Sequence, residues 1–173
     1  MIVPLEHKIP TVSPLAFLAP DCWIIGDVTL ADEASVFFGS VLRGDIQPIT
    51  IGARTNLQDQ CIIHSSGGRS PVIIGEDTTV GHRATIHGAR VGNRCLVGMG
   101  AILLDDAVIE DEAIVAAGAL VKEGMRVPSR TLVMGIPAKV VRELTNEELA
   151  FLKKSADHYV EKALMYRKVF SEN

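Results

Sequence analysis

The chain has 173 residues and a formal net charge of −4, a size that fits one domain with one core. The acidic balance argues against nucleic acid as a partner and favours a small molecule. Apolar residues make up 47% of the chain and aromatic residues only 5%, so small aliphatic side chains must fill the core. We therefore expect a single domain spanning residues 1–173.

The N-terminal residues 1–8 lack the charged-then-apolar pattern of a signal peptide, and no apolar run reaches membrane-spanning length. These features predict a cytoplasmic protein without a membrane partner. The three cysteines, Cys22, Cys61 and Cys95, contain no C-x-x-C pair. They indicate buried thiols rather than a disulfide framework or thiolate metal ligands.

An aliphatic residue recurs every six positions, in runs of three that begin at Leu30, Ile51 and Ile74. A longer run follows without a slip, at Val91, Val97, Leu103, Ile109, Val115 and Val121. The fourth residue after most of these aliphatics is small, and the two patterns together predict a solenoid of short strands. Three hexapeptides make one triangular coil, provided that residues 65–71, rich in Ser and Gly, form a loop at a corner.

The segment after the repeats has a different period. Thr145 and Glu148 form a capping-box pattern, and apolar residues then recur at helical spacing. We predict a solenoid over residues 11–141 and a C-terminal α-helix over about 146–170.

Polar residues follow the aliphatics on one face. Arg43, His64 and His87 each come directly after an inward aliphatic residue, so they stack in one outward column with ~4.8 Å between rungs. Two such imidazoles can share one metal ion. His82 lies two residues after Val80, at the corner of the preceding face, so a symmetric neighbour could supply it as a third ligand.

The repeats resemble the hexapeptide family, whose members fold as left-handed parallel β-helices, so the expected class is mainly β with a C-terminal α-helix. The polar motifs are more specific: Arg43-Gly44-Asp45, Asn56-Leu57-Gln58-Asp59, His64, and His82 followed by His87. They are similar to those of the γ-class carbonic anhydrases. The resemblance implies a homotrimer in which His64, His82 and His87 bind zinc, or iron(II) or cobalt(II), at subunit interfaces.

The same resemblance implies the other site residues. Arg43 and Asp45 would form ion pairs across the interface, and Gln58 would hydrogen-bond the solvent or substrate at the metal. Asn56 and Asp59 would organise the surroundings. The residues alone leave other roles open, because Arg43 and Asp45 also suit an exposed salt bridge, and Asn56 and Asp59 suit turns at a coil corner.

Three neutral imidazoles leave one position of a tetrahedral zinc ion open to water, which indicates a catalytic site. A metal-bound hydroxide could then hydrate carbon dioxide reversibly to bicarbonate, a zinc-dependent lyase reaction of the carbonate dehydratase type. The family's proton-shuttling glutamates are absent: Ile46 follows Asp45, and residues 65–71 contain no acid. Low activity is therefore expected. Tyr159 resembles a helix tyrosine that approaches the metal in related proteins, although its spacing also suits packing.

Three alternatives stay open. A thioesterase acting on acyl-CoA could use the same metal, and a non-catalytic trimeric scaffold could use the metal only for assembly. A hexapeptide acyltransferase would share the fold, but it normally relies on one histidine and is disfavoured by the three matched ones.

Overall fold

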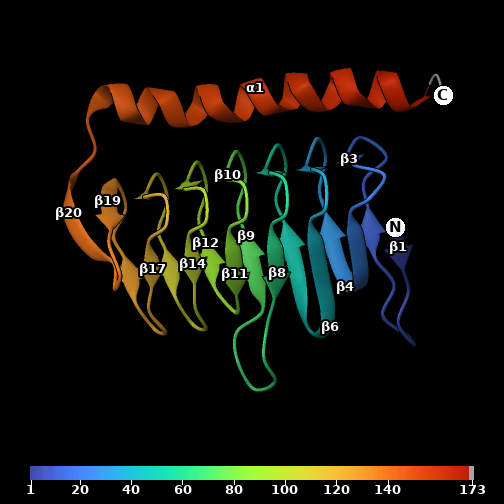
Figure 1. Cartoon of the computed structure of the whole chain (residues 1–173), viewed down its shortest axis with the longest axis horizontal. Coiled ribbons are helices and arrows are strands. Elements are labelled where there is room, and N and C mark those ends of the chain that lie inside the picture. Colours follow the sequence, from blue (N-terminus) through green and yellow to red (C-terminus); the bar gives the residue numbers. More distant parts are fainter. Residues whose placement is uncertain (172–173) are drawn as a thin grey trace.

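The hexapeptides wind into a solenoid because each contributes one short strand whose backbone bonds to the equivalent strand of the next coil. The computed structural model describes residues 1–171, in which triangular coils stack in a row and one helix, α1 (Asn146–Ser171), lies along them (Figure 1). The predicted mainly β, parallel β-helix with a C-terminal α-helix is confirmed.

The helix-covered face of the solenoid is one parallel sheet. It carries α1 on its outside, and Figure 1 shows the helix running over the whole row of coils. Its parallel strands are β3 (Phe17–Leu18), β5 (Ser35–Val36), β7 (Asn56–Leu57), β10 (Thr79–Val80), β13 (Leu96–Val97), β16 (Ile114–Val115) and β19 (Thr131–Met134). At its end β20 (Lys139–Glu143) turns back antiparallel to β19.

The other two faces belong to one sheet that bends around a corner. Two long strands, β4 (Trp23–Leu30) and β6 (Val41–Ile51), run through both faces, and β1 (Ile2–Val3) and β2 (Thr11–Val12) pair with β4. We call the face that follows the helix-covered face in each coil the histidine face. Beyond β4 and β6 it consists of β8 (Ile62–His64), β11 (Thr85–His87), β14 (Ile102–Leu103) and β17 (Leu120–Val121). The third face continues with β9 (Val72–Ile74), β12 (Arg90–Val91), β15 (Val108–Ile109) and β18 (Arg126–Val127).

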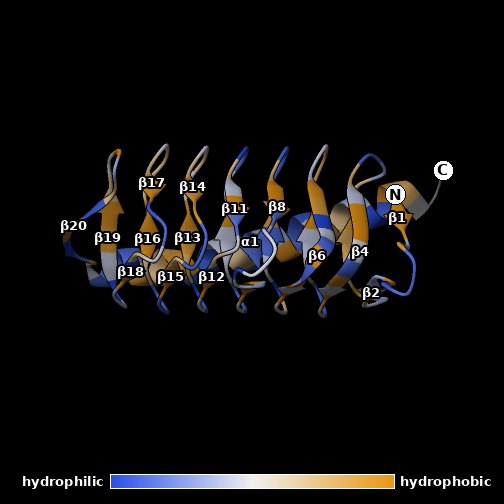
Figure 2. Ribbon diagram, turned by 90° about the horizontal axis from the view of Figure 1, so that it is seen from below, coloured by the Kyte–Doolittle hydropathy of each residue, from blue (hydrophilic) through white to orange (hydrophobic). Residues whose placement is uncertain are grey.

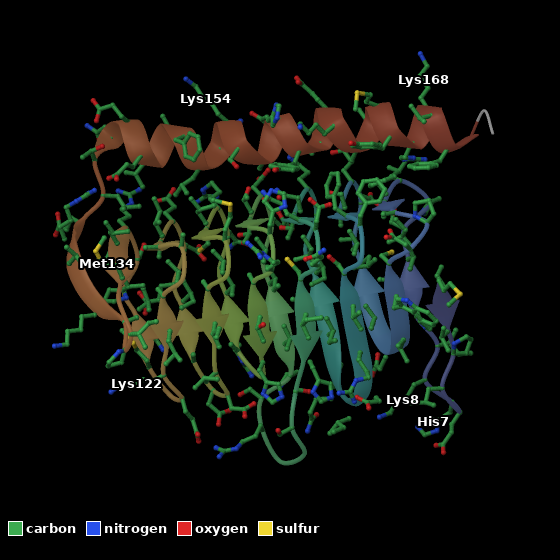
Figure 3. All side chains as sticks on the ribbon, in the orientation of Figure 1. His7, Lys8, Lys122, Met134, Lys154 and Lys168 are labelled. Atoms are coloured by element: carbon green, nitrogen blue, oxygen red, sulfur yellow. The ribbon has the colours of Figure 1, made fainter. Side chains whose placement is uncertain are left out.

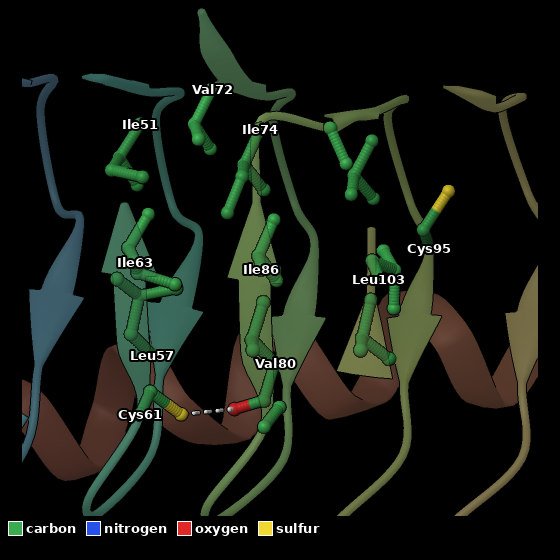
Figure 4. Packing of buried hydrophobic residues seen from close by; sticks show 14 of the residues in the cluster. Ile51, Leu57, Cys61, Ile63, Val72, Ile74, Val80, Ile86, Cys95 and Leu103 are labelled. Carbon is green, nitrogen blue, oxygen red and sulfur yellow. Dashed lines mark hydrogen bonds between the residues drawn. The ribbon is translucent and has the colours of Figure 1, made fainter. Parts of the chain in front are cut away.

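The core is a set of stacked aliphatic rows inside the triangle. Ile63, Ile86 and Leu103 stack in register along the histidine face and are fully buried (Figure 4). Cys61 and Cys95 fill small inward positions, and burial raises the pKa of their thiols to about 12 and about 11. The prediction of buried thiols is therefore confirmed, and neither thiol is poised as a nucleophile.

The helix begins at the predicted capping box. The Glu148 amide donates to Thr145 Oγ1 at 3.2 Å, and the Thr145 amide donates to Glu148 Oε2 at 2.9 Å. Lys154 and Lys168 extend from the side of α1 that faces away from the coils (Figure 3). Within residues 1–171, no helix has both the length and the apolar character needed to cross a membrane.

The histidine face presents apolar side chains outward. Its outward residues form a register ladder from strand to strand, and Trp23, Ile62 and Ile102 on it are 39%, 42% and 37% exposed. Figure 2 shows the hydrophobic colouring of β8 and β14 on this side. Exposed apolar side chains aligned along a sheet are typical of a surface that is covered in an assembly.

Candidate metal centre

His64 and His87 lie side by side at one edge of the histidine face. They end β8 and β11 and are register partners, as the six-residue pattern predicted. His64 Nδ1 lies 3.3 Å from His87 Nε2, and the two ring centroids are 5.3 Å apart. The corner loop at residues 65–71 follows directly after His64 and protrudes from the solenoid between β8 and β9 (Figure 1).

A carboxylate holds the other nitrogen of each ring. His64 Nε2 lies 3.0 Å from Asp45 Oδ1, and His87 Nδ1 lies 3.0 Å from Asp105 Oδ1. Arg43 pairs with Asp45 within the same chain. Burial raises the pKa of Asp45, but hydrogen bonds from Arg43 and His64 outweigh it and leave that pKa below its ordinary value. Burial lowers the pKa of His64 and so favours the neutral ring.

The carboxylates bear on which nitrogens of the two rings carry protons. When the nitrogen beside each carboxylate carries the N–H of a neutral imidazole, the nitrogens 3.3 Å apart both present lone pairs. Two lone pairs at this distance repel unless a cation lies between them. Two ligands of a tetrahedral zinc ion, each at ~2.0–2.1 Å, are separated by roughly 3.3 Å, so His64 and His87 fit such an ion. The carboxylates match the usual partners of metal-bound histidines.

His82 occupies the opposite edge of the same face. It follows β10 in the corner between the helix-covered face and the histidine face, and its Nδ1 lies 2.8 Å from Asp59 Oδ2. Asp59 is itself held by the Phe38 amide at 3.2 Å. The corner is tight because a Cβ on Gly81 would lie 2.7 Å from the Met99 amide nitrogen, so only glycine fits before His82.

One chain does not assemble the three predicted ligands. Among the described residues, no three His, Cys, Asp or Glu side chains gather closely enough to hold a metal ion. His82 nevertheless repeats the pattern of the other two histidines, since one nitrogen faces a carboxylate and the other is left for a ligand. The chain therefore places the three predicted ligands in two groups at the two edges of the histidine face, which we call the candidate half-sites.

Gln58 and Asn56 lie beside the His82 half-site, beneath α1. Gln58 Nε2 donates to Asn56 Oδ1 at 3.4 Å, and Asn56 Nδ2 donates to Thr79 Oγ1 at 3.0 Å. Asn56 is fully buried and Gln58 is 6% exposed. Asn56 is thus part of a buried polar network on the outer surface of β7, not a corner turn.

Tyr159 projects from α1 toward the same half-site. Together with Gln58 and His82 it lines two cavities, of about 420 and 170 Å³. Its ring also packs edge-on against Phe37, with centroids 5.5 Å apart, so it both packs and borders the site. Burial, followed by the negative charge of Asp59, raises the pKa of the Tyr159 hydroxyl.

The sequence pattern missed three residues of this region. Asp105 lies one coil beyond His87, 18 residues later, in a segment that is aliphatic apart from Asp105 and its neighbour Asp106. Thr79 precedes the inward Val80, and nothing in the sequence around it marked it as part of a site. Ser155 lies one helical turn before Tyr159, and that spacing could have found it.

Comparisons with known proteins agree with the family that these motifs resemble. Residues 71–105 match the family model described as the hexapeptide repeat of succinyl-transferase. The chain is 43% identical over 167 residues to a carbonic anhydrase of Geobacillus kaustophilus, covering 96% of this chain and 91% of that protein. It is 44% identical over 157 residues to the mitochondrial gamma carbonic anhydrase 1 of Arabidopsis thaliana, covering 88% of this chain but only 57% of that protein.

A solved structure has the same architecture. The crystal structure of a presumed acetyltransferase from Bacillus cereus superposes with a TM-score of 0.96 at 42% identity, covering 98% of both chains. The fold is therefore shared by proteins whose names point to different activities.

Proposed function

Because this chain belongs to the γ-carbonic anhydrase family, we propose that it is a metal-dependent enzyme that hydrates carbon dioxide reversibly to bicarbonate. The proposed ion is zinc, with iron(II) or cobalt(II) as alternatives. The proposed ligands are His64 and His87 of one subunit and His82 of its neighbour in a homotrimer.

One observation carries this proposal. Two imidazoles face each other with ring nitrogens 3.3 Å apart, while a carboxylate lies 3.0 Å from the opposite nitrogen of each ring. A purely structural histidine pair would gain stability by offering a proton to one of the two facing nitrogens. A bound zinc ion supplies a Lewis acid that makes water a nucleophile near neutral pH.

The apolar histidine face supports the trimer. The half-site with His64 and His87 lies at one edge of this face and His82 at the other. If three copies turn this face toward a common axis, the first edge of each copy meets the second edge of the next, and all three contacts are equivalent. The exposed Trp23, Ile62 and Ile102 are then removed from water.

Residues around His82 would handle the substrate. Gln58 and Tyr159 border the cavities next to His82, with Gln58 Oε1 free to accept a hydrogen bond and the Tyr159 hydroxyl free to donate one. Burial keeps the Tyr159 proton in place by raising its pKa. At the other half-site, the Arg43 guanidinium beside Asp45 would attract a bicarbonate anion.

Transfer of a proton from the proposed site to solvent is the step for which this chain offers the fewest groups. Ile46 follows Asp45, and the loop at residues 65–71 carries a serine-rich segment with one arginine and no acid. Arg69 of that loop pairs instead with Asp106 and Glu123. We therefore propose an enzyme with a modest turnover number that rises when the buffer itself can accept protons.

The test loads the purified protein with zinc, iron(II) or cobalt(II) without air exposure, then measures bound metal and carbon dioxide hydration. We expect one ion per chain and hydration that increases with imidazole buffer. His87→Ala should lose both metal and activity. The matched control is His158→Ala, since His158 is an exposed histidine on α1 that contacts no carboxylate of either half-site.

Other outcomes separate the alternatives. Metal-loaded protein that hydrates no carbon dioxide but cleaves acyl-CoA thioesters would replace the proposal with a thioesterase. Transfer of an acetyl group from acetyl-CoA would support the activity assigned to the Bacillus cereus relative. Inactivity in all three assays, with the trimer lost on metal removal, would indicate a scaffold.

A further inference from the structure

A chain of hydrogen bonds connects α1 to Gln58. Ser155 Oγ lies 2.9 Å from Thr79 Oγ1, which accepts from Asn56 Nδ2 at 3.0 Å, and Asn56 Oδ1 accepts from Gln58 Nε2 at 3.4 Å. Thr79 and Asn56 are register partners on β10 and β7. Both side chains are buried, at 2% and 0% exposure, so water does not compete for the bond between them.

The side-chain amides of Asn56 and Gln58 can turn only together. If the Asn56 amide turned, its nitrogen would face the Gln58 nitrogen, and two donors would be left opposed. Gln58 would therefore have to turn as well, and its nitrogen rather than its oxygen would face the cavities beside His82. The hydrogen bond between Asn56 and Thr79 decides between the two arrangements of these amides.

The Thr79 hydroxyl has one hydrogen to give. When Ser155 Oγ accepts that hydrogen, Thr79 can offer Asn56 only a lone pair, and Asn56 must point its nitrogen at Thr79. Without Ser155, the hydrogen can rotate toward Asn56 Oδ1, and the reversed arrangement becomes equally satisfied. With Ser155 Oγ as the acceptor in this bond, the serine on the helix selects the orientation of the Asn56 amide and, through it, that of Gln58.

We propose that Ser155 and Thr79 are positioning residues that, through Asn56, fix Gln58 with its Oε1 toward the cavity beside His82. An oxygen there accepts a hydrogen bond, so the site favours a ligand that carries a proton on its oxygen, such as water or bicarbonate. The functional consequence rests on the proposed carbon dioxide hydration, whereas the orientation of Gln58 does not.

An ion pair holds α1 in the rotational position that brings Ser155 to Thr79. Arg54 on the solenoid pairs with Asp157 on α1, two residues from Ser155, and also with Asp77 at 2.7 Å. Tyr159 lies one turn further on the same side of the helix and lines both cavities. Ser155 and Tyr159 are therefore presented to the half-site by one rigid segment of α1.

The first test observes Gln58 directly. The chain has three glutamines, Gln47, Gln58 and Gln60, so ¹⁵N-glutamine labelling gives three side-chain amide pairs in an NMR spectrum. Gln58→Glu identifies its pair. In the wild type we expect this pair to exchange slowly with deuterium, and in Ser155→Ala and Thr79→Val we expect exchange at least about tenfold faster. Thr79→Ser keeps the hydroxyl and should keep the protection.

The second test separates positioning from helix anchoring. Arg167 also ties α1 to the solenoid, through the carbonyls of Leu15 at 2.7 Å and Pro14 at 2.9 Å, and it is not among the residues that hydrogen-bond to the network of Gln58. Ser155→Ala should lower kcat about tenfold with little change in KM. A loss of about tenfold is the lower end of the range expected when a residue that orients a group of a metal site is replaced. Arg167→Ala should change neither kcat nor the Gln58 signals.

The outcomes are distinct. Unchanged Gln58 exchange in both Ser155→Ala and Thr79→Val, in proteins that remain folded by circular dichroism, would overturn the proposal. An equal loss of protection in Arg167→Ala would also overturn it. Faster Gln58 exchange in a protein without any carbon dioxide hydration would keep the positioning role and overturn only the proposed function.

Discussion

Each histidine of the candidate centre is oriented by one carboxylate: Asp45 for His64, Asp59 for His82 and Asp105 for His87. A carboxylate on the far nitrogen fixes the tautomer and raises the basicity of the nitrogen left for a ligand. Of these three acids, Asp105 belongs to a coil beyond the histidines. It links the proposed site to the next turn of the solenoid.

Asp105→Asn should weaken zinc binding by about 10- to 100-fold, because an amide holds the His87 ring less firmly and polarises it less. The neighbouring Asp106→Asn is the matched control, since Asp106 contacts Arg69 and Ser70 and neither histidine. Competition with a coloured zinc chelator measures both affinities. Equal affinities in the two variants would show that Asp105 plays no part in the site.

The histidine pair was predictable and its acid partner was not, for a physical reason. The position of His64 and His87 follows from the phase of the repeat, because a residue directly after an inward aliphatic must project from the same edge in every coil. Asp105 reaches back across a corner to the preceding coil, and that direction depends on local backbone angles. Its acid type alone does not distinguish it from Asp106.

The helix α1 is the element that completes the His82 half-site. Its start was predictable to the residue, because the capping box is a local pattern, and the observed helix at Asn146–Ser171 matches the expected 146–170. Its contact with β7 and β10 was not, since helical periodicity shows which face is apolar but not what it covers. The network from Ser155 to Gln58 therefore emerged only with the structure.

The capping box should stabilise the helix measurably. Thr145→Ala removes the acceptor for the Glu148 amide and should cost about 1 kcal/mol of unfolding free energy. Thr145→Ser keeps the hydroxyl and should recover most of that loss. Urea unfolding followed by circular dichroism measures the difference, and an unchanged midpoint in Thr145→Ala would contradict this role.

The same cap makes stability depend on pH. Hydrogen bonds from Arg142 and the Thr145 amide lower the pKa of Glu148 to about 2, below its ordinary 4.5. A lowered pKa in the folded state gives stability that is complete above the unfolded pKa and is lost as the pH falls through the folded one. The urea midpoint of Glu148→Gln should thus lie below wild type at about pH 6 and approach it near about pH 2.5. A constant difference would refute the linkage.

At the scale of the whole molecule, one face carries both half-sites at its edges and apolar side chains between them. The repeat identified the strands of this face, but not that its outward positions are apolar enough for association.

Ile62→Asp should give monomers without bound metal, because a charge cannot be buried unpaired at the proposed interface. Ile73→Asp is the control, since Ile73 is similarly exposed, at 37%, on the third face. Light scattering with metal analysis measures both, and a metal-loaded monomer of Ile62→Asp would contradict the interface.

The most direct test of the account asks whether one ion needs two chains. His64→Ala and His82→Ala should each bind no metal as pure proteins. Refolded together at equal amounts, they should recover about one quarter of the wild-type sites, because each such site needs an intact His64 from one chain and an intact His82 from its neighbour. Mixed oligomers that bind no metal, or either single variant that binds it fully, would contradict a centre shared between subunits.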